Sequence, residues 1–210
     1  MGLFISFEGV YGCGKSRQTA FLADYLKEKG HEVLVTREPG GCPVAEQIRD
    51  MLLDPGNTAI TPLTEALLYA AARAQHVEEV IRPALAQGKT VICDRYVDSS
   101  VAYQGSGRSL GPELVEEVNK FATDGLLPDI TFFLDVTPEE AQLRMHSRTT
   151  TDRLESAGME FQHQLYEEYR RLQKMHPERI VAIDASGTKF ETQEKVQDVL
   201  TAFLAGREDS

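Results

Sequence analysis

The chain has 210 residues, a formal net charge of −11, and hydrophobic and charged fractions of 41% and 26%. This length and composition are typical of one globular domain with a sizeable core. The acidic balance excludes a general nucleic-acid binder, which needs a basic face, and the most apolar run, ALLYAAA, is far too short to span a membrane. We therefore expect neither a nucleic-acid nor a membrane partner.

Five short β-rich runs alternate with longer helical patterns. The expected strands are 3–8, 32–37, 90–95, 130–136 and 179–184. Each is a nearly continuous apolar run, which is typical of a parallel sheet covered on both faces. The expected helices are 15–29, 43–53, 62–87, 112–123, 138–147, 156–176 and 190–205. This alternation predicts one α/β domain over residues 1–210, with a five-stranded parallel sheet flanked by helices in three layers.

Two polar stretches lie outside this pattern. Residues 147–156 contain three consecutive threonines, which disfavour a helix, and we expect a mobile loop there. The terminal residues 206–210, GREDS, are polar, and we expect them to be disordered.

The segment GVYGCGKS, residues 9–16, lies between the first expected strand and the first expected helix. It fits the phosphate-binding pattern Gly-x-x-x-x-Gly-Lys-Ser in the strand–loop–helix setting that this motif requires, which predicts a P-loop NTPase fold. Backbone N–H groups of such a loop and the N-terminus of the next helix bind phosphates. Lys15 is expected to reach the terminal phosphates, and Ser16 to coordinate Mg²⁺. The predicted nucleotide-binding residues are Gly9, Val10, Tyr11, Gly12, Cys13, Gly14, Lys15, Ser16 and Arg17.

A carboxylate is needed to hold a metal beside the phosphates. Asp94 supplies one at the end of the third expected strand, and Arg95 follows it. Ligands of open α/β sheets collect at the carboxyl ends of strands. We therefore expect Ser16 and Asp94 to form the metal site. The alternative is that Asp94 and Arg95 are an ordinary surface pair at a strand end.

Four further fragments point to the same edge of the sheet. TREPGG places Arg37 at the end of the second expected strand, before a glycine-rich turn. In TEALLYAAARAQH, the side chains of Tyr69, Arg73 and His76 are three or four positions apart and share one face of a helix. DSSVAYQG adds hydroxyls, an aromatic ring and an amide. The fourth fragment is basic and contains Arg144, Arg148 and Arg153.

With these fragments in place, the sequence resembles the thymidylate kinases, or dTMP kinases, of the P-loop nucleoside-monophosphate kinase group. The matching pieces occur in family order and cover nearly the whole chain: FEGVYGCGKS, TREPGG, TEALLYAAARAQH, DRYVDSSVAYQG, LLPDITFFLDVTPEEA and DRLE. The resemblance implies transfer of the γ-phosphoryl group from ATP to dTMP with Mg²⁺, giving dTDP for dTTP synthesis. It also implies a homodimer, formed through the helices of residues 43–53, 62–87 and 112–123.

The resemblance assigns residues to the acceptor base and sugar. Tyr69 stands where the family stacks an aromatic ring on thymine. Arg73 and Gln104 would hydrogen-bond the base. Tyr103 would lie under the deoxyribose, where a ribose 2′-hydroxyl would clash with it.

The resemblance also assigns the acceptor phosphate. Arg37, Arg49 and Arg95 would hold it, because guanidinium groups match phosphate oxygens bidentately. The implied dTMP site comprises Tyr11, Arg37, Pro39, Arg49, Tyr69, Arg73, Arg95, Ser99, Ser100, Tyr103 and Gln104.

Thymidylate kinases place a catalytic arginine either in the phosphate loop or in the lid. The phosphate-loop position is Gly12 in this chain. The resemblance makes residues 147–156 the lid, and this segment contains Arg148 and Arg153, which resembles the bacterial type with a basic lid. A lid arginine would neutralise charge on the transferring phosphoryl group. Arg144 is expected to contact ATP, and which lid arginine is catalytic stays open. The implied catalytic residues are Lys15, Arg95, Arg148 and Arg153.

Two residues depart from the family pattern. Tyr11 stands where the family carries Asp or Glu, which contacts the sugar 3′-hydroxyl, and Arg17 replaces a threonine. Tyr11 is either a tolerated variant that hydrogen-bonds the sugar through its hydroxyl, or it alters sugar selectivity, or a partner carboxylate such as Glu8 or Glu38 takes over. Two other functions therefore stay open: a kinase for another nucleoside monophosphate or a deoxynucleoside, and a nucleotide-binding module with weakened catalysis.

The three cysteines, Cys13, Cys42 and Cys93, have no metal-ligand spacing. We interpret them as reduced thiols of a cytoplasmic protein. Cys13 lies inside the phosphate loop, where we expect a small side chain that fills space.

Overall fold

The computed structural model of the chain describes residues 2–145 and 158–208. Its centre is a five-stranded sheet in the order β2-β3-β1-β4-β5, and every pair of neighbouring strands is parallel. The strands are β1 (Phe4–Glu8), β2 (Val33–Arg37), β3 (Thr90–Asp94), β4 (Ile130–Asp135) and β5 (Ile180–Asp184). All five expected strands are confirmed, with bounds that agree within one residue.

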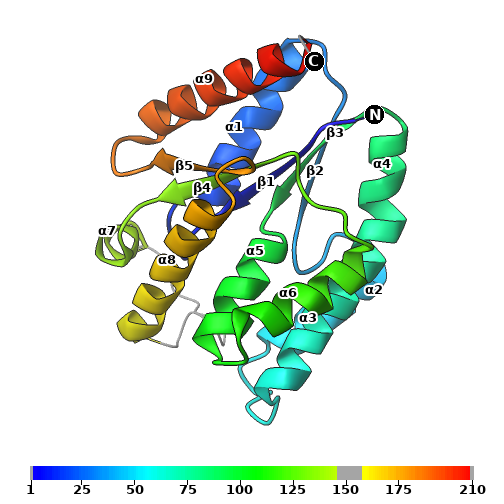
Figure 1. Cartoon of the computed structure of the whole chain (residues 1–210), viewed down its shortest axis with the longest axis vertical. Coiled ribbons are helices and arrows are strands. Elements are labelled where there is room, and N and C mark those ends of the chain that lie inside the picture. Colours follow the sequence, from blue (N-terminus) through cyan, green and yellow to red (C-terminus); the bar gives the residue numbers. More distant parts are fainter. Residues whose placement is uncertain (1, 146–157, 209–210) are drawn as a thin grey trace.

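Helices cover both faces of this sheet. Figure 1 shows α1 and α9 on one side and α5, α6 and α8 on the other, which confirms the three layers. The helices are α1 (Lys15–Glu28), α2 (Pro43–Leu53), α3 (Pro62–His76), α4 (Arg82–Ala86), α5 (Val97–Ser100), α6 (Pro112–Thr123), α7 (Pro138–Leu143), α8 (Gly158–Met175) and α9 (Lys189–Glu208). Two π-helical segments are η1 (Val77–Ile81) and η2 (Val101–Gly107).

The core lies between these layers. Inward-facing strand residues such as Phe7, Ile92 and Phe132 have exposed fractions of 0%. The strands need no polar alternation because helices exclude water from both faces. Among the described residues, no helix is long and apolar enough to cross a membrane.

Three sequence-based expectations need correction. The expected helix 62–87 is interrupted by η1, so it is α3, a π-helical segment and α4 in succession. No helix was expected over residues 97–107, but they form α5 and η2. The terminal residues were expected to be disordered from 206 onward, but α9 continues to Glu208, where Arg207 pairs with Asp129 at 2.7 Å. The expected lid, 147–156, lies outside the described residues.

Candidate active site

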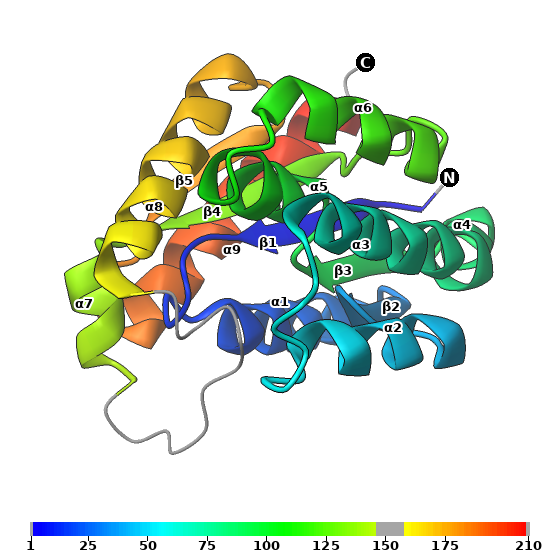
Figure 2. The same ribbon diagram turned by 90° about the horizontal axis from the view of Figure 1, so that it is seen from below.

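A pocket of about 1040 Å³ opens at the carboxyl ends of the strands, where the phosphate loop, the end of β3, α3 and η2 meet. Figure 2 views this region from below, with α1, α3 and α5 around the end of β1. Ligands of open α/β sheets bind at this edge. The predicted site residues that line the pocket are Tyr11, Gly12, Cys13, Gly14, Lys15, Ser16, Arg17, Arg37, Pro39, Arg49, Tyr69, Arg73, Asp94, Arg95, Ser99, Ser100, Tyr103, Gln104 and Arg144.

The predicted residues outside this lining fall into two groups. Gly9 and Val10 are buried at the start of the phosphate loop, beneath the pocket. Arg148 and Arg153 lie outside the described residues, so their expected catalytic role stays a prediction.

The phosphate loop turns tightly between β1 and α1. Its residue Gly12 has φ +83, and a Cβ there would lie 2.6 Å from the Ala141 carbonyl oxygen. This position therefore accepts glycine and excludes an arginine. The Lys15 ammonium is buried and donates to the carbonyl oxygens of Gly9 and Val10, each at 3.0 Å. Burial, together with the charge of Arg95, lowers the pKa of Lys15.

The expected metal ligands lie side by side. The Ser16 hydroxyl, in the first turn of α1, donates to Asp94 Oδ2 at the end of β3, at 2.6 Å. A hydroxyl and a carboxylate are the oxygen donors that hard divalent cations such as Mg²⁺ prefer. The two residues therefore fit a metal beside the phosphate loop, and their role as its ligands stays a prediction.

Arg95 is held in one orientation from several sides. Its φ of 70° lies in the left-handed region, which is rare outside glycine and concentrates at functional sites. Its Nη1 donates to Gly9 O, Ser99 Oγ and Tyr169 Oη at 3.1 to 3.2 Å. The guanidinium carbon lies 5.1 Å from the centre of the Tyr103 ring. Tyr169, on α8, is a supporting residue that sequence reasoning missed because it is 74 positions away.

Glu8 supports Arg95 from behind the pocket. Its Oε2 accepts from the Ser99 hydroxyl at 2.5 Å and from the Tyr169 hydroxyl at 3.2 Å. Burial, with the charge of Asp98, raises the pKa of Glu8 to about 7. Glu8 is fully buried and does not line the pocket, so it is not placed to replace the family carboxylate at the sugar. Glu38, the other candidate, does line the pocket.

Arg73 connects α3 to three other segments. Its Nε donates to Glu38 Oε2 at 2.6 Å, and its Nη2 to the Tyr96 carbonyl at 3.1 Å. Its Nη1 donates to Ser100 Oγ at 2.9 Å and to Asn119 Oδ1. Asn119, on α6, is a second supporting residue that sequence reasoning missed, since nothing local marks its burial.

Two arginines form the basic wall of the pocket near β2. Arg37 Nη1 lies 2.7 Å from Glu46 Oε1, and Arg49 Nη1 donates to the Pro39 carbonyl at 2.7 Å. The Arg37 hydrogen bond is the main cause that lowers the pKa of Glu46 to about 2. Both arginines stay charged and line the pocket, so they suit an anionic ligand.

The other end of the pocket lies near the loop after β5. Arg144 Nη2 donates to the carbonyl oxygens of Ala185 and Ser186, at 2.7 and 3.0 Å. Gly187 and Lys189 from this loop also line the pocket. The pocket therefore extends past the phosphate loop on both sides.

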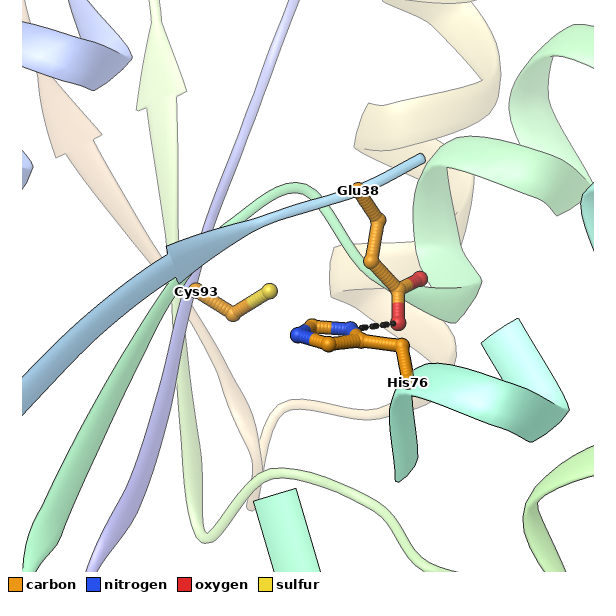
Figure 3. Close-up of side chains that lie close together, drawn as sticks. All are labelled: Glu38, His76 and Cys93. Carbon is orange, nitrogen blue, oxygen red and sulfur yellow. Dashed lines mark hydrogen bonds and ion pairs between the residues drawn. The ribbon is translucent and has the colours of Figure 1, made fainter. Parts of the chain in front are cut away.

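Glu38, His76 and Cys93 form a buried cluster where the end of β2, the end of α3 and β3 come together (Figure 3). The potential metal-ligating atoms of the three residues lie within 4.8 Å of one another. Both imidazole nitrogens are already engaged, Nδ1 with Glu38 at 2.9 Å and Nε2 with the Thr36 hydroxyl at 2.7 Å. Burial raises the pKa of the Cys93 thiol well above its usual value. The thiol is therefore protonated when no metal is bound, and the hydrogen bonds of His76 make the cluster a polar support.

Comparisons with known proteins agree on one family. A family model described as thymidylate kinase matches residues 7–196. The chain is 47% identical to a thymidylate kinase of Geotalea uraniireducens, over 98% of this chain and 99% of that protein. It is 49% identical to a thymidylate kinase of Thermoanaerobacter sp., over 97% and 99% of the two chains. A crystal structure of thymidylate kinase from Ehrlichia chaffeensis superimposes with a TM-score of 0.76 at 32% identity, covering 94% of this chain and 98% of that one.

Proposed function

The chain belongs to the thymidylate kinase family, whose members phosphorylate dTMP to dTDP with ATP, and we propose which of its residues perform each part of that transfer. The pocket binds ATP at the phosphate loop and dTMP between α3, η2 and the end of β2. The enzyme is a phosphotransferase of nucleotide biosynthesis.

The ATP end is built from the loop and α1. Backbone N–H groups of the loop and the N-terminus of α1 bind the phosphates. Lys15 turns from the carbonyl oxygens it now contacts toward the terminal phosphates. Arg144 and the loop that contains Gly187 line the way to the adenosine.

The acceptor end is built from buried polar groups. Tyr69 and Tyr103 form its aromatic walls, and both have 8% exposed area. Arg73 and Gln104 meet the base. The acceptor phosphate binds among the arginines at the mouth, which are Arg37, Arg49 and Arg95.

Stabilisation of charge between the ATP end and the acceptor end of the pocket lowers the barrier to phosphoryl transfer. Lys15 and Arg95 offset the negative charge that spreads over the transferring phosphoryl group, and fixed donors in a water-poor site need little reorganisation. Ser16 and Asp94 would hold Mg²⁺, which neutralises phosphate charge when it is bound. The buried support of Arg95 by Ser99 and Tyr169 keeps its guanidinium directed at the same place throughout.

The observation that carries this proposal is the convergence of Lys15, the Ser16–Asp94 pair and Arg95 on one pocket. The test is a phosphoryl-transfer panel with ATP, Mg²⁺ and four acceptors: dTMP, dUMP, UMP and 3′-deoxy-dTMP. Rapid dTDP formation with weak use of UMP supports the arrangement. Equal use of UMP and dTMP would contradict the placement of Tyr103 under the sugar.

We further propose a homodimer. Figure 1 shows α2, α3 and α6 side by side at one end of the molecule. These helices expose large apolar side chains, which mark interaction surfaces when they gather on one face. Half or more of Leu63, Leu67 and Phe121 is exposed. A cytoplasmic location is also proposed, and the three free thiols support it.

A further inference from the structure

The orientation of the Gln104 amide is fixed by a buried carboxylate. Gln104 lies on η2 and lines the pocket, with 1% of its area exposed. Its Nε2 donates to Glu65 Oε1 at 2.9 Å. Glu65 lies in the first turn of α3 and has no exposed area. Glu65 does not line the pocket itself.

Glu65 forms an ion pair with a neighbouring cation. Arg108 donates to its two oxygens from Nε at 3.2 Å and from Nη2 at 3.4 Å. An ionised carboxylate only accepts hydrogen bonds. The amide of Gln104 must therefore present its NH₂ group to Glu65, and the reversed orientation would bring two acceptor oxygens together.

This orientation determines which hydrogen-bonding atom of Gln104 faces the pocket. Because Nε2 is engaged with Glu65, the carbonyl Oε1 remains as an acceptor, and no described residue donates to it. Arg73, in contrast, offers the pocket a hydrogen-bond donor. Four of its five N–H groups donate to described residues, which leaves one on Nη2, and a guanidinium has no acceptor.

A pair of one donor and one acceptor distinguishes pyrimidines. Thymine and uracil carry a donor at N3–H and an acceptor at O4, which complement Gln104 Oε1 and Arg73. Cytosine carries an acceptor at N3 and a donor at the 4-amino group, so both contacts would become repulsive. A site that leaves buried polar groups unpaired rejects the wrong ligand strongly.

We propose that Glu65 is a specificity-determining positioning residue: it holds Gln104 with its carbonyl toward the acceptor base and thereby selects thymine or uracil over cytosine. The inference rests on the proposed placement of Gln104 at the base. Glu65 acts through Gln104 and touches neither substrate.

The test is Glu65→Gln, which keeps the shape and removes the charge. Arg108 would draw the carbonyl of the new amide toward itself, so its NH₂ group would face Gln104. Gln104 would then turn its own NH₂ group into the pocket. We expect the KM for dTMP to rise about tenfold, the kcat to stay within about twofold, and the dTMP-over-dCMP preference in kcat/KM to fall at least about tenfold.

The matched control is Glu168→Gln. Glu168 is also a buried glutamate paired with an arginine, Arg171 at 2.6 Å, but it lies on α8 away from the pocket. It should leave the dTMP-over-dCMP preference unchanged. Thermal melting checks that each variant is folded. If Glu65→Gln does not fold, Glu65→Leu replaces it, and the preference must fall there as well.

Three results overturn the inference: an unchanged preference in a folded Glu65 variant, an equal loss for both acceptors, or a loss confined to kcat. Gln104→Leu separates this outcome from a failure of the proposed site. If Gln104→Leu leaves the KM for dTMP unchanged, Gln104 does not meet the base and the site is misplaced. If it raises the KM while the Glu65 variants keep their preference, the site stands and the inference fails.

Discussion

The Ser16 hydroxyl and the Asp94 carboxylate lie 2.6 Å apart, although 78 positions separate them in the chain. The contact joins the first turn of α1 to the end of β3. It exists because β1 and β3 are neighbours in the sheet, so the loop after β1 and the end of β3 share one edge. Two oxygen donors at the rim of a phosphate loop are the arrangement that a divalent cation with a bound polyphosphate requires.

Asp94→Asn should weaken the response to Mg²⁺. Loss of the carboxylate charge is expected to raise the half-saturating Mg²⁺ concentration about tenfold, with partial recovery of turnover at high Mg²⁺. The measurement is turnover against Mg²⁺ concentration. Asp135→Asn, at the end of β4 and bonded to Tyr166 at 2.8 Å, is the matched control and should leave this curve in place. Identical curves for the two variants would contradict the metal assignment.

Glu8→Gln should flatten the dependence of stability on pH. The folded pKa of Glu8 is about 7, above the ordinary 4.5, because of burial and then the charge of Asp98. The folded state therefore binds the proton of Glu8 more tightly than the unfolded state does. The resulting contribution to the free energy of unfolding is complete below about pH 4.5 and is lost as the pH rises through 7. Arg95 and the Ser99 hydroxyl, which also face Glu8, oppose the shift.

The loss attributable to Glu8 amounts to about 3 kcal/mol, since one pKa unit corresponds to about 1.4 kcal/mol. Urea unfolding near pH 5 and near pH 8 should show a larger decrease for the wild type than for Glu8→Gln. Parallel decreases in the two proteins would show that Glu8 titrates normally.

Leu67→Glu should convert the proposed dimer to a monomer. Leu67 lies on α3 with 50% of its area exposed, and a charge in an apolar interface is costly to bury. Sedimentation velocity measures the change. Phe190→Glu, at a side chain of α9 with 58% of its area exposed, should keep the dimer, because α9 lies far from α2, α3 and α6 (Figure 1). A Leu67→Glu protein that sediments like the wild type would place the interface elsewhere.

Tyr11→Phe should weaken the use of acceptors that carry a 3′-hydroxyl. Tyr11 lines the pocket beside the phosphate loop. One neutral hydrogen bond contributes about 0.5–1.5 kcal/mol, so the expected loss is roughly two- to tenfold in kcat/KM. A 3′-deoxy acceptor should be used equally by both proteins. The idea fails if the change affects both acceptors to the same extent.

The strands and most helices could be predicted from the sequence because their signals are local. Continuous apolar runs located the strands within one residue, and the expected helices 43–53 and 112–123 have the observed bounds of α2 and α6. The segment 97–107 was missed because its serines and β-branched residues disfavour a helix locally. It is helical because it packs against α6 and α8, which are distant in the chain.

The residues of the candidate site also fall into those that a local sequence signal marks and those that it does not. Residues with a sequence motif, such as Lys15 and Asp94, could be named in advance. The supporting groups could not, since a buried Glu65 or Asn119 looks like any polar helix residue until its partner, some 40 positions away, is placed beside it. The lid arginines remain predictions from the sequence.

The central claim is that phosphoryl transfer depends on the phosphate loop, and Lys15→Ala tests it most directly. The measurement is dTDP formation at saturating ATP, Mg²⁺ and dTMP, in a variant whose thermal melting matches that of the wild type. Removing a charge that acts on the transferring group should lower kcat by about a hundredfold or more. A folded Lys15→Ala protein that retains kcat within about tenfold of the wild type would contradict the account.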